Sequence, residues 1–191
     1  MTEAGPAPAI PAIRSVAAGE WPVVAWLWQA FRNDLATVLD SFPRPDGRYR
    51  HDLLARYPSP DRAGYLAWAP HPGTGDPAPV GFALVDGLGG PRRTIAALFV
   101  VPAARRGGWG RRLALETLRA HEGPWAVAFQ HDNEAAARFW RAVADEAFGT
   151  TWDEEQLPVP GRPDVPADHW ITSPLLDPVL PPPASRRAGE R

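Results

Sequence analysis

Hydrophobic residues along the chain follow two different spacings. Between residues 21 and 39, apolar side chains recur every three or four positions, which predicts an amphipathic helix with Pro22 in its first turn. The same spacing predicts three further helices, over 49–57, 110–121 and 133–147. Alternating or continuous apolar runs predict strands at 13–18, 64–69, 80–87, 93–101, 125–130, around 149–156, and 168–173. The chain is therefore expected to be an α/β or mixed α+β protein.

The order of these elements predicts how the sheet is connected. Three consecutive strands between residues 64 and 101 favour an antiparallel meander, and the strand–helix–strand succession over 93–130 favours parallel pairing. We expect a single twisted, mixed sheet of about seven strands with helices on both faces. The domain is predicted to span 13–174, between a flexible segment over 1–12 and a proline-rich tail over 175–191 that we expect to be disordered.

Composition narrows the classes of function. The 191 residues are 45% hydrophobic, which suits one domain with its own core, and the net charge of −2 argues against a nucleic-acid partner. The absence of cysteine excludes thiolate metal sites and a cysteine nucleophile, and we expect no metal. The first residues lack the basic start and apolar run of a signal peptide, so we expect none, and no apolar run reaches about 18 residues. All basic residues are arginine, which is typical of a GC-rich genome. We expect a cytoplasmic bacterial protein that does not bind membranes.

The sequence RRGGWGRR, at residues 105–112, has three possible interpretations. It can be an arginine–glycine patch for RNA, a tight turn, or a glycine turn that holds phosphate. A buried strand is predicted to end at Val101 and a helix to begin near Gly110, which directs backbone amides and the positive helix end toward one point. Gly108 and Gly110 permit close approach of an anion. This setting favours phosphate over RNA, and Arg105, Arg106, Arg111 and Arg112 add positive charge.

Two motifs resemble those of the GCN5-related N-acetyltransferase (GNAT) superfamily. The acetyl-CoA motif V-x-P-x-x-[RQ]-x-x-G-x-[GA] is matched by Val100, Pro102, Arg105, Gly108 and Gly110. The later motif N-x-x-A-x-x-F-[YW] is matched by Asn133, Ala136, Phe139 and Trp140. The resemblance covers roughly residues 13–173 and is strongest to a group of predicted acetyltransferases.

This resemblance implies the GNAT fold, acetyl-CoA as the acyl donor and an amine as the acceptor. It implies that the cofactor is contacted by Phe99, Val100, Val101, Arg105, Arg106, Gly107, Gly108, Trp109, Gly110, Arg111, Asn133, Phe139 and Trp140. In this arrangement the backbone of Val100 and Val101 would bind pantetheine, amides 106–111 would hold the pyrophosphate, and amides near Phe99 and Val100 would stabilise the oxyanion. Asn133 can instead be only a helix cap, and Phe139 and Trp140 only core residues.

The sequence departs from the family at the proton-transfer groups. Where many relatives carry a glutamate base and a tyrosine acid, this chain has Ala97 and Trp140. The candidate catalytic residues are therefore His131 at the end of a strand, Tyr49 on the second predicted helix, and Asp168 at the start of the last strand. An amine that arrives neutral needs no base.

Two functions follow from this pattern. The first is an acetyl-CoA-dependent N-acetyltransferase that acts on an amine, more readily of a small molecule than of a protein. The alternative is a non-catalytic acyl-CoA-binding domain. Tryptophans on the first helix and on strands suggest a flat, apolar or cationic acceptor if they face the cleft. A homodimer is compatible with the sequence.

Overall fold

The computed structural model describes residues 12–39, 41–159 and 161–173. The predictions for most of the first segment and for the tail fall outside these residues. The strands are β1 (Ile13–Ser15), β2 (Arg62–Pro70), β3 (Pro77–Asp86), β4 (Arg93–Val100), β5 (Trp125–Phe129), β6 (Asp153–Leu157) and β7 (Asp168–Thr172).

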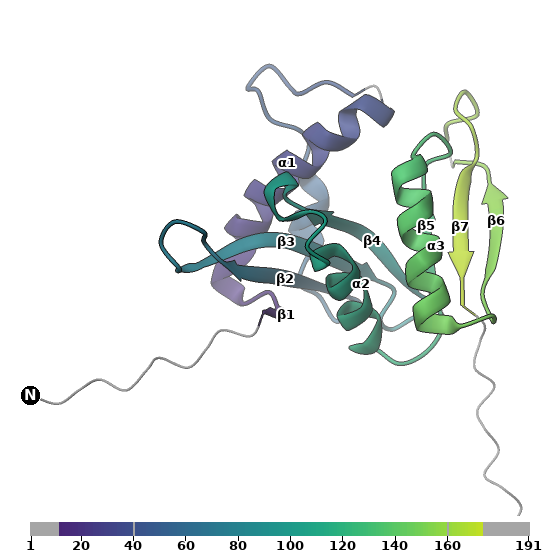
Figure 1. The fold of residues 1–191 in the computed structure, drawn as a ribbon. Coiled ribbons are helices and arrows are strands. Elements are labelled where there is room, and N and C mark those ends of the chain that lie inside the picture. The colour runs from purple at the N-terminus through teal and green to yellow at the C-terminus, as the bar shows by residue number, and fades with distance from the viewer. Residues whose placement is uncertain (1–11, 40, 160, 174–191) are drawn as a thin grey trace, which may run out of the picture.

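The seven strands form one mixed sheet in the order β1-β2-β3-β4-β5-β7-β6 (Figure 1). The strands from β1 to β4 are antiparallel neighbours, β4 and β5 run parallel, and β5, β7 and β6 are again antiparallel. This arrangement confirms the predicted meander, the parallel crossover and the single mixed sheet.

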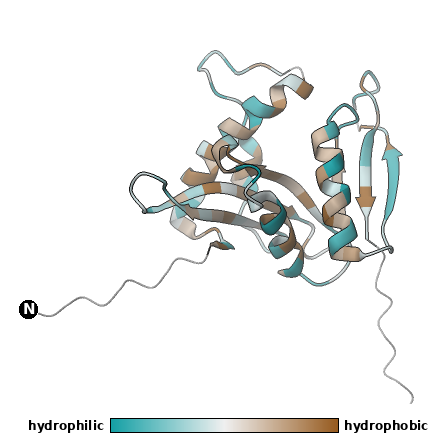
Figure 2. Cartoon of the chain, in the orientation of Figure 1, coloured by the Kyte–Doolittle hydropathy of each residue, from teal (hydrophilic) through white to brown (hydrophobic). Residues whose placement is uncertain are grey.

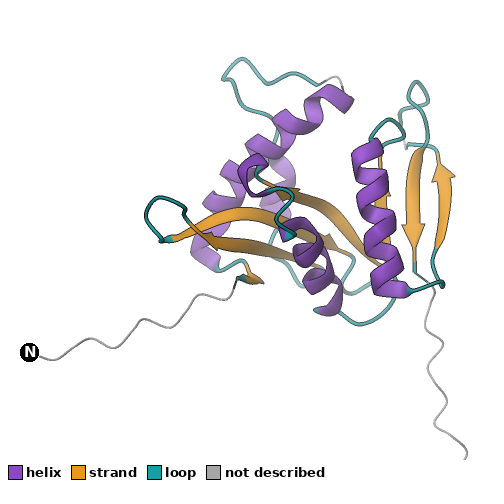
Figure 3. Cartoon of the chain, viewed as in Figure 1, coloured by secondary structure: helices purple, strands orange, loops and turns teal. Residues whose placement is uncertain are grey.

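Three α-helices cover the sheet: α1 (Trp21–Leu39), α2 (Trp109–Arg119) and α3 (Glu134–Phe148). Figure 3 shows α2 and α3 together in front of the sheet and α1 behind it. Short 3₁₀ turns lie at η1 (Ala18–Glu20), η2 (Asp52–Arg56) and η3 (Pro102–Ala104). No helix within the described ranges is both long and apolar enough to cross a membrane.

The hydrophobic core has two parts, one on each face of the sheet. Under α2 and α3, Leu113, Leu118 and Val143 pack on strand residues such as Val127. Under α1, the core is made by Val24, Leu27, Trp28, Leu54, Tyr57, Leu66, Phe82, Leu84, Ala97 and Phe99. Figure 2 shows the outer strand β6 as largely hydrophilic. Burial on both faces explains why the runs in β3 and β4 are nearly continuously apolar.

The predicted helix over 49–57 is wrong, because the structure has only the 3₁₀ turn η2 there. Side chains of α1 bind the backbone groups that a helix would need. The Gln29 amide accepts a hydrogen bond from Tyr49 N at 2.7 Å and donates to Tyr49 O at 3.2 Å. Trp28 Nε1 donates to Arg50 O at 2.7 Å. Long-range contacts with α1 thus hold this segment out of a helix.

Strands β4 and β5 pair over a short distance only. Their register joins Arg93, Thr94 and Ile95 to Trp125, Ala126 and Val127, and β4 continues to Val100 without β5. On its other side β4 stays paired with β3, with a bulge at Ala96 between Ile95 and Ala97. The second half of β4 therefore has one edge without a strand partner.

Gly81 of β3 lies opposite Val100 of β4. A Cβ at this position would lie 2.5 Å from Phe99 O, which is a backbone atom and cannot move aside alone. We predict that Gly81→Ala lowers the free energy of unfolding by about 1–3 kcal/mol, the range for overpacking. Urea denaturation measures this change. Gly19→Ala is the control because its Cβ would meet nothing within 4 Å, and equal losses in both variants would contradict the prediction.

His121 makes stability depend on pH. Its Nε2 lies 2.7 Å from the Tyr65 hydroxyl, and burial lowers the pKa of His121, with the positive charge of Arg93 lowering it further. Neutral His121 thus stabilises the fold fully above about pH 6.5, the ordinary pKa of histidine, and this contribution is lost as pH falls through the lower folded value.

We predict that His121→Gln makes stability less sensitive to acidification below about pH 6.5. The measurement is the urea midpoint of both proteins between pH 5 and pH 8. The two curves should converge toward low pH, and parallel curves would show that His121 does not cause the dependence.

Candidate functional site

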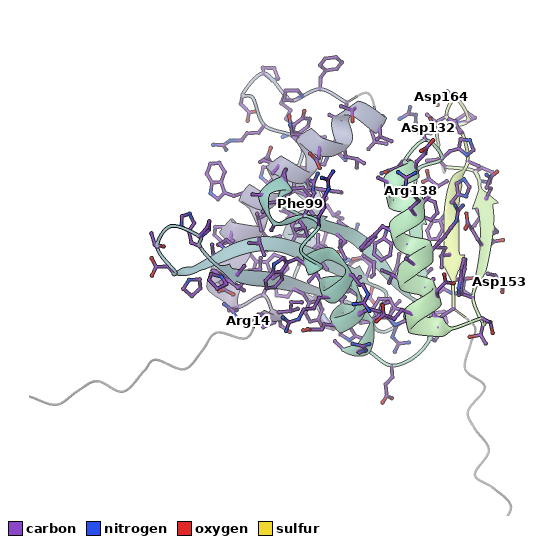
Figure 4. The ribbon with its side chains drawn as sticks, viewed as in Figure 1. Arg14, Phe99, Asp132, Arg138, Asp153 and Asp164 are labelled. Carbon is purple, nitrogen blue, oxygen red and sulfur yellow. The ribbon has the colours of Figure 1, made fainter. Side chains whose placement is uncertain are left out.

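A cavity of about 530 Å³ lies between the end of β4, the loop before α2, the start of α3 and one side of α1. All predicted cofactor residues except Val101, Gly107 and Trp109 line it. The residues of α1 that complete the wall are Phe31, Asp34, Leu35 and Val38. Sequence reasoning missed these four, because nothing in the helical spacing says which strand the helix approaches. Figure 4 labels Phe99 at this end of β4.

The loop before α2, which lines this cavity with Arg106, Gly108 and Gly110, contains backbone amides without hydrogen-bond acceptors. Gly108 is the N-cap residue of α2 with φ +79°, and no side chain caps the helix. The first bond of the helix is from Arg112 N to Gly108 O, at 2.9 Å. Within the described chain, the amides of residues 106–111 donate to no acceptor. Together with the positive end of α2, these amides form a site suited to an anion such as pyrophosphate.

Arg105 holds the loop against α1 and β4. Its Nε donates to Val100 O at 2.9 Å, its guanidinium is paired with Asp34 of α1, and it lies 5.5 Å from the centre of the Phe99 ring. Arg105 therefore bridges the two walls of the cavity. The carbonyl of Val100, predicted to bind pantetheine, already accepts this bond.

The edge of β4 that faces the cavity carries free amides. Val101 N donates to Val80 O at 2.8 Å, which places Val101 in a hydrogen-bonded pair with β3. Because amides alternate in direction along a strand, those of Leu98 and Val100 point away from β3. β5 has already separated from β4 at this level, so both amides face the space between the strands. An extended ligand can bind this edge as an added strand.

A second cavity, of about 370 Å³, opens on the α1 face of the sheet. It is lined from α1, η2, the middle of β4 and the end of β5, and it includes Ala96 and Ala97. The residues that line both cavities are Phe31, Leu35, Leu98, Asn133, Ala136 and Trp140. The two cavities thus meet where β4 and β5 separate. Two molecules entering from opposite sides can meet there.

Asn133 and Trp140 have the structural roles that the sequence allowed, and both also line the cavities. Asn133 Oδ1 accepts a hydrogen bond from Ala136 N at 3.1 Å and so caps α3, and the residue also lines both cavities. Trp140 is buried in the core beside Phe139, with ring centres 4.8 Å apart. Its inner face packs in the core while the residue forms part of the shared wall. A structural role therefore does not exclude either residue from the cavity wall.

The residues predicted for proton transfer do not line either cavity. The His131 ring stacks on His169 of β7 with ring centres 5.3 Å apart, on the side of β5 remote from β4. Asp168 begins β7, and burial raises the pKa of its carboxyl. The Tyr49 hydroxyl lies 3.5 Å from Asn33 Oδ1.

His131 belongs to a polar group on the β7–β6 side. His169 Nδ1 donates to Glu154 at 2.6 Å, and Gln156 lies 3.0 Å from His169 Nε2. Two bonds of 2.7 Å join Glu154 to Arg141, which together with His169 lowers the pKa of this carboxyl. These contacts use Glu154 within the fold. In the part of the chain described here, no group of three or more histidine or acidic residues could hold a metal ion.

Arg106 adopts a backbone conformation that favours glycine. Its φ is +65°, the only positive value at a non-glycine residue among the described positions. A side chain in this left-handed region costs about 1–2 kcal/mol. Arg106 lines the cavity and adds positive charge to its wall.

We predict that Arg106→Gly is more stable than Arg106→Ala by about 1 kcal/mol, because only glycine is unstrained there. The control is Arg112 inside α2, where glycine should be less stable than alanine by about 1 kcal/mol. Chemical denaturation of the four variants tests this reversal of sign. The same order at both positions would contradict the left-handed conformation of Arg106.

Comparison with known proteins gives a consistent result. The profile of the acetyltransferase (GNAT) family matches residues 22–144. Similar solved structures include an acetyltransferase from Thermus thermophilus, with 18% identity, a TM-score of 0.59, and coverage of 86% of this chain and 98% of the other. No match was found among curated proteins.

Two further structures share the fold. NAA60 of Arabidopsis thaliana in complex with acetyl-CoA has 12% identity and a TM-score of 0.55, covering 84% of this chain and 96% of its own. The ribosomal-protein-S18-alanine N-acetyltransferase of Escherichia coli has 15% identity and a TM-score of 0.53, and the match covers 85% of this chain and 92% of the other.

Proposed function

This chain belongs to the acetyltransferase (GNAT) family, and we propose that it transfers an acetyl group from acetyl-CoA to the amine of a small molecule. The observation that carries the proposal is the meeting of two cavities at the separation of β4 and β5, with unpaired amides at the far end of one. That geometry suits a long, phosphate-bearing donor on one side and a compact acceptor on the other.

The larger cavity fits acetyl-CoA. Amides 106–111 can bind the pyrophosphate, with Arg106 and Arg111 adding charge. Gly108 has open space where a Cβ would be, so the loop leaves room for phosphate oxygens. The free amide of Val100 can bind a carbonyl group of the pantetheine arm. In a complex with the related fold, acetyl-CoA is the bound molecule.

The shared wall is suited to direct acyl transfer. A neutral amine attacks the thioester carbonyl, a C–N bond forms, the C–S bond breaks, and the amine loses a proton as the thiolate leaves. Of the two free amides, that of Leu98, which lies in the shared wall, can donate to the developing oxyanion, which leaves that of Val100 for the pantetheine arm. We call the second cavity, of about 370 Å³, the acceptor-side cavity. No aspartate, glutamate, histidine or tyrosine of the described chain lines it. The amine is therefore proposed to arrive already neutral, and positioning supplies much of the rate.

His131, Tyr49 and Asp168 remain the proposed groups for proton transfer through water. His131 has the strongest case, because it directly follows Gln130, which lines the acceptor-side cavity. A histidine at this position can accept a proton near neutral pH.

The alternative is an acyl-CoA-binding domain without turnover. Ala97 and Trp140 favour it, because neither can act as base or acid. Binding of acetyl-CoA without amine-dependent thiol release would select this alternative over the enzyme.

We predict that acetyl-CoA raises the melting temperature with increasing concentration, as ligands of the native state do. Arg106→Ala should weaken binding by about tenfold or more, the effect of one charge-assisted hydrogen bond. Calorimetry measures both affinities. Arg138→Ala, which removes an exposed charge paired with Glu134, is the control and should bind normally. Unchanged affinity in Arg106→Ala would remove this arginine from the proposed site.

We predict that the pH profile of acetyl transfer follows the acceptor rather than the protein. With two amines whose pKa values differ by about two units, the rise in kcat/KM should shift by about the same amount. Release of free thiol from acetyl-CoA, measured between pH 6 and pH 10, tests this. A rise at one pH for both amines would instead identify a base on the protein, and its loss in His131→Ala would assign that base.

A further inference from the structure

The acceptor-side cavity has an unusual charge pattern. Arg32 is the only ionisable residue that lines it within the described chain. The other polar residues of the lining are Gln130 and Asn133, and Asn133 already caps α3. Asp34, an acidic residue two positions after Arg32 in α1, lines the larger cavity instead and is paired with Arg105. The cavity is thus positive and has no carboxylate of its own.

Arg32 has no partner among the described residues. No ion pair or hydrogen bond joins it to another described residue, and its Nε is buried without an acceptor. Most other arginines near the two cavities are engaged: Arg105 with Asp34 and Arg111 with Glu146. A guanidinium without an acidic partner beside an apolar cavity is unfavourable, and a carboxylate in the cavity would pair with its terminal nitrogens, which are not closed off as Nε is, through charge-assisted hydrogen bonds.

The remaining wall of the cavity is apolar and partly aromatic. It includes Trp28 and Phe31 of α1, Phe129 at the end of β5 and Trp140 of α3. The volume of about 370 Å³ falls in the range of small-molecule sites. Of the tryptophans that the sequence suggested for the acceptor, Trp28 lines this cavity, whereas Trp26 is exposed elsewhere on α1. Flat, apolar bodies fit such a wall.

We propose that the acceptor is a small amine that carries a carboxylate on an apolar or aromatic body, and that Arg32 binds the carboxylate. This proposal rests on the proposed function and names the substrate class of the same site. It disfavours polyamines and other cationic acceptors, because no described residue of the cavity offsets a second positive charge. The charge of Arg32 also favours the neutral form of a nearby amine, which the transfer requires.

The first experiment measures binding alone, with probes that have no amine. Phenylacetate and phenylacetamide have nearly the same shape and differ in charge. Saturation-transfer NMR titrations with the full chain should show phenylacetate binding at least about tenfold more tightly, the effect of one charged hydrogen-bonded contact. Arg32→Gln should abolish this preference. Arg56→Gln, which removes an exposed charge from the nearby η2, should retain it.

Equal binding of the two probes, no binding of either, or a preference that survives in Arg32→Gln would overturn the proposal. These outcomes do not depend on acetyl transfer, because neither probe can be acetylated.

The second experiment measures turnover with acetyl-CoA. Thiol release should have a kcat/KM for phenylalanine at least about tenfold above that for phenylalaninamide, and Arg32→Gln should reduce the ratio to near one. A preference for the amide, or for spermidine, would overturn the assignment of the acceptor while leaving acetyl transfer established. If acetyl-CoA itself fails to bind, the proposed function fails, whereas phenylacetate binding still reports on Arg32.

Discussion

The free edge of β4 is the constraint on which the site depends. Buried main-chain amides need hydrogen-bond partners, yet beyond Ile95 this strand has β3 on one side and no strand on the other. The bulge at Ala96 changes the strand locally just where β5 departs. Beyond that point a space separates β4 from β5. Helix α1 closes one side of this space and α3 closes the other. An extended ligand completes the hydrogen bonding that the sheet leaves open.

The loop at 105–110 imposes a related requirement at the end of that space. Its backbone turns sharply into α2, with Arg106 and Gly108 at positive φ and the amides of residues 106–111 without acceptors in the described chain. Arg105 does not lie free at the rim but connects Val100 and Asp34. Charge and conformation in RRGGWGRR therefore have separate roles: Arg105 joins the walls of the cavity, Arg111 is paired with Glu146, and the following amides with Arg106 are left for the proposed phosphate site.

Local patterns predicted most of the fold, because α1, α3 and the apolar strands carry strong periodicity and order alone suggested the parallel crossover. The loop was also predictable, since its glycines follow a buried strand. The segment over 49–57 was not, because its conformation is set by Gln29 and Trp28 across the chain. The sequence did not single out Arg32 either, because an arginine on a helix is usually exposed. Only the fold shows that Arg32 lines a cavity together with residues of β4 and β5. The catalytic predictions had only proximity in sequence as support.

The short pairing of β4 with β5 also has a mechanical meaning. Three residue pairs form the parallel contact between the four strands before it and the three strands after it. Across this line the two parts are also joined by the packing of α2 on α3, by the ion pair between Arg111 and Glu146, and by the core under both helices. A ligand bound between β4 and β5 would therefore add contacts between the two parts of the sheet where the strands themselves pair least.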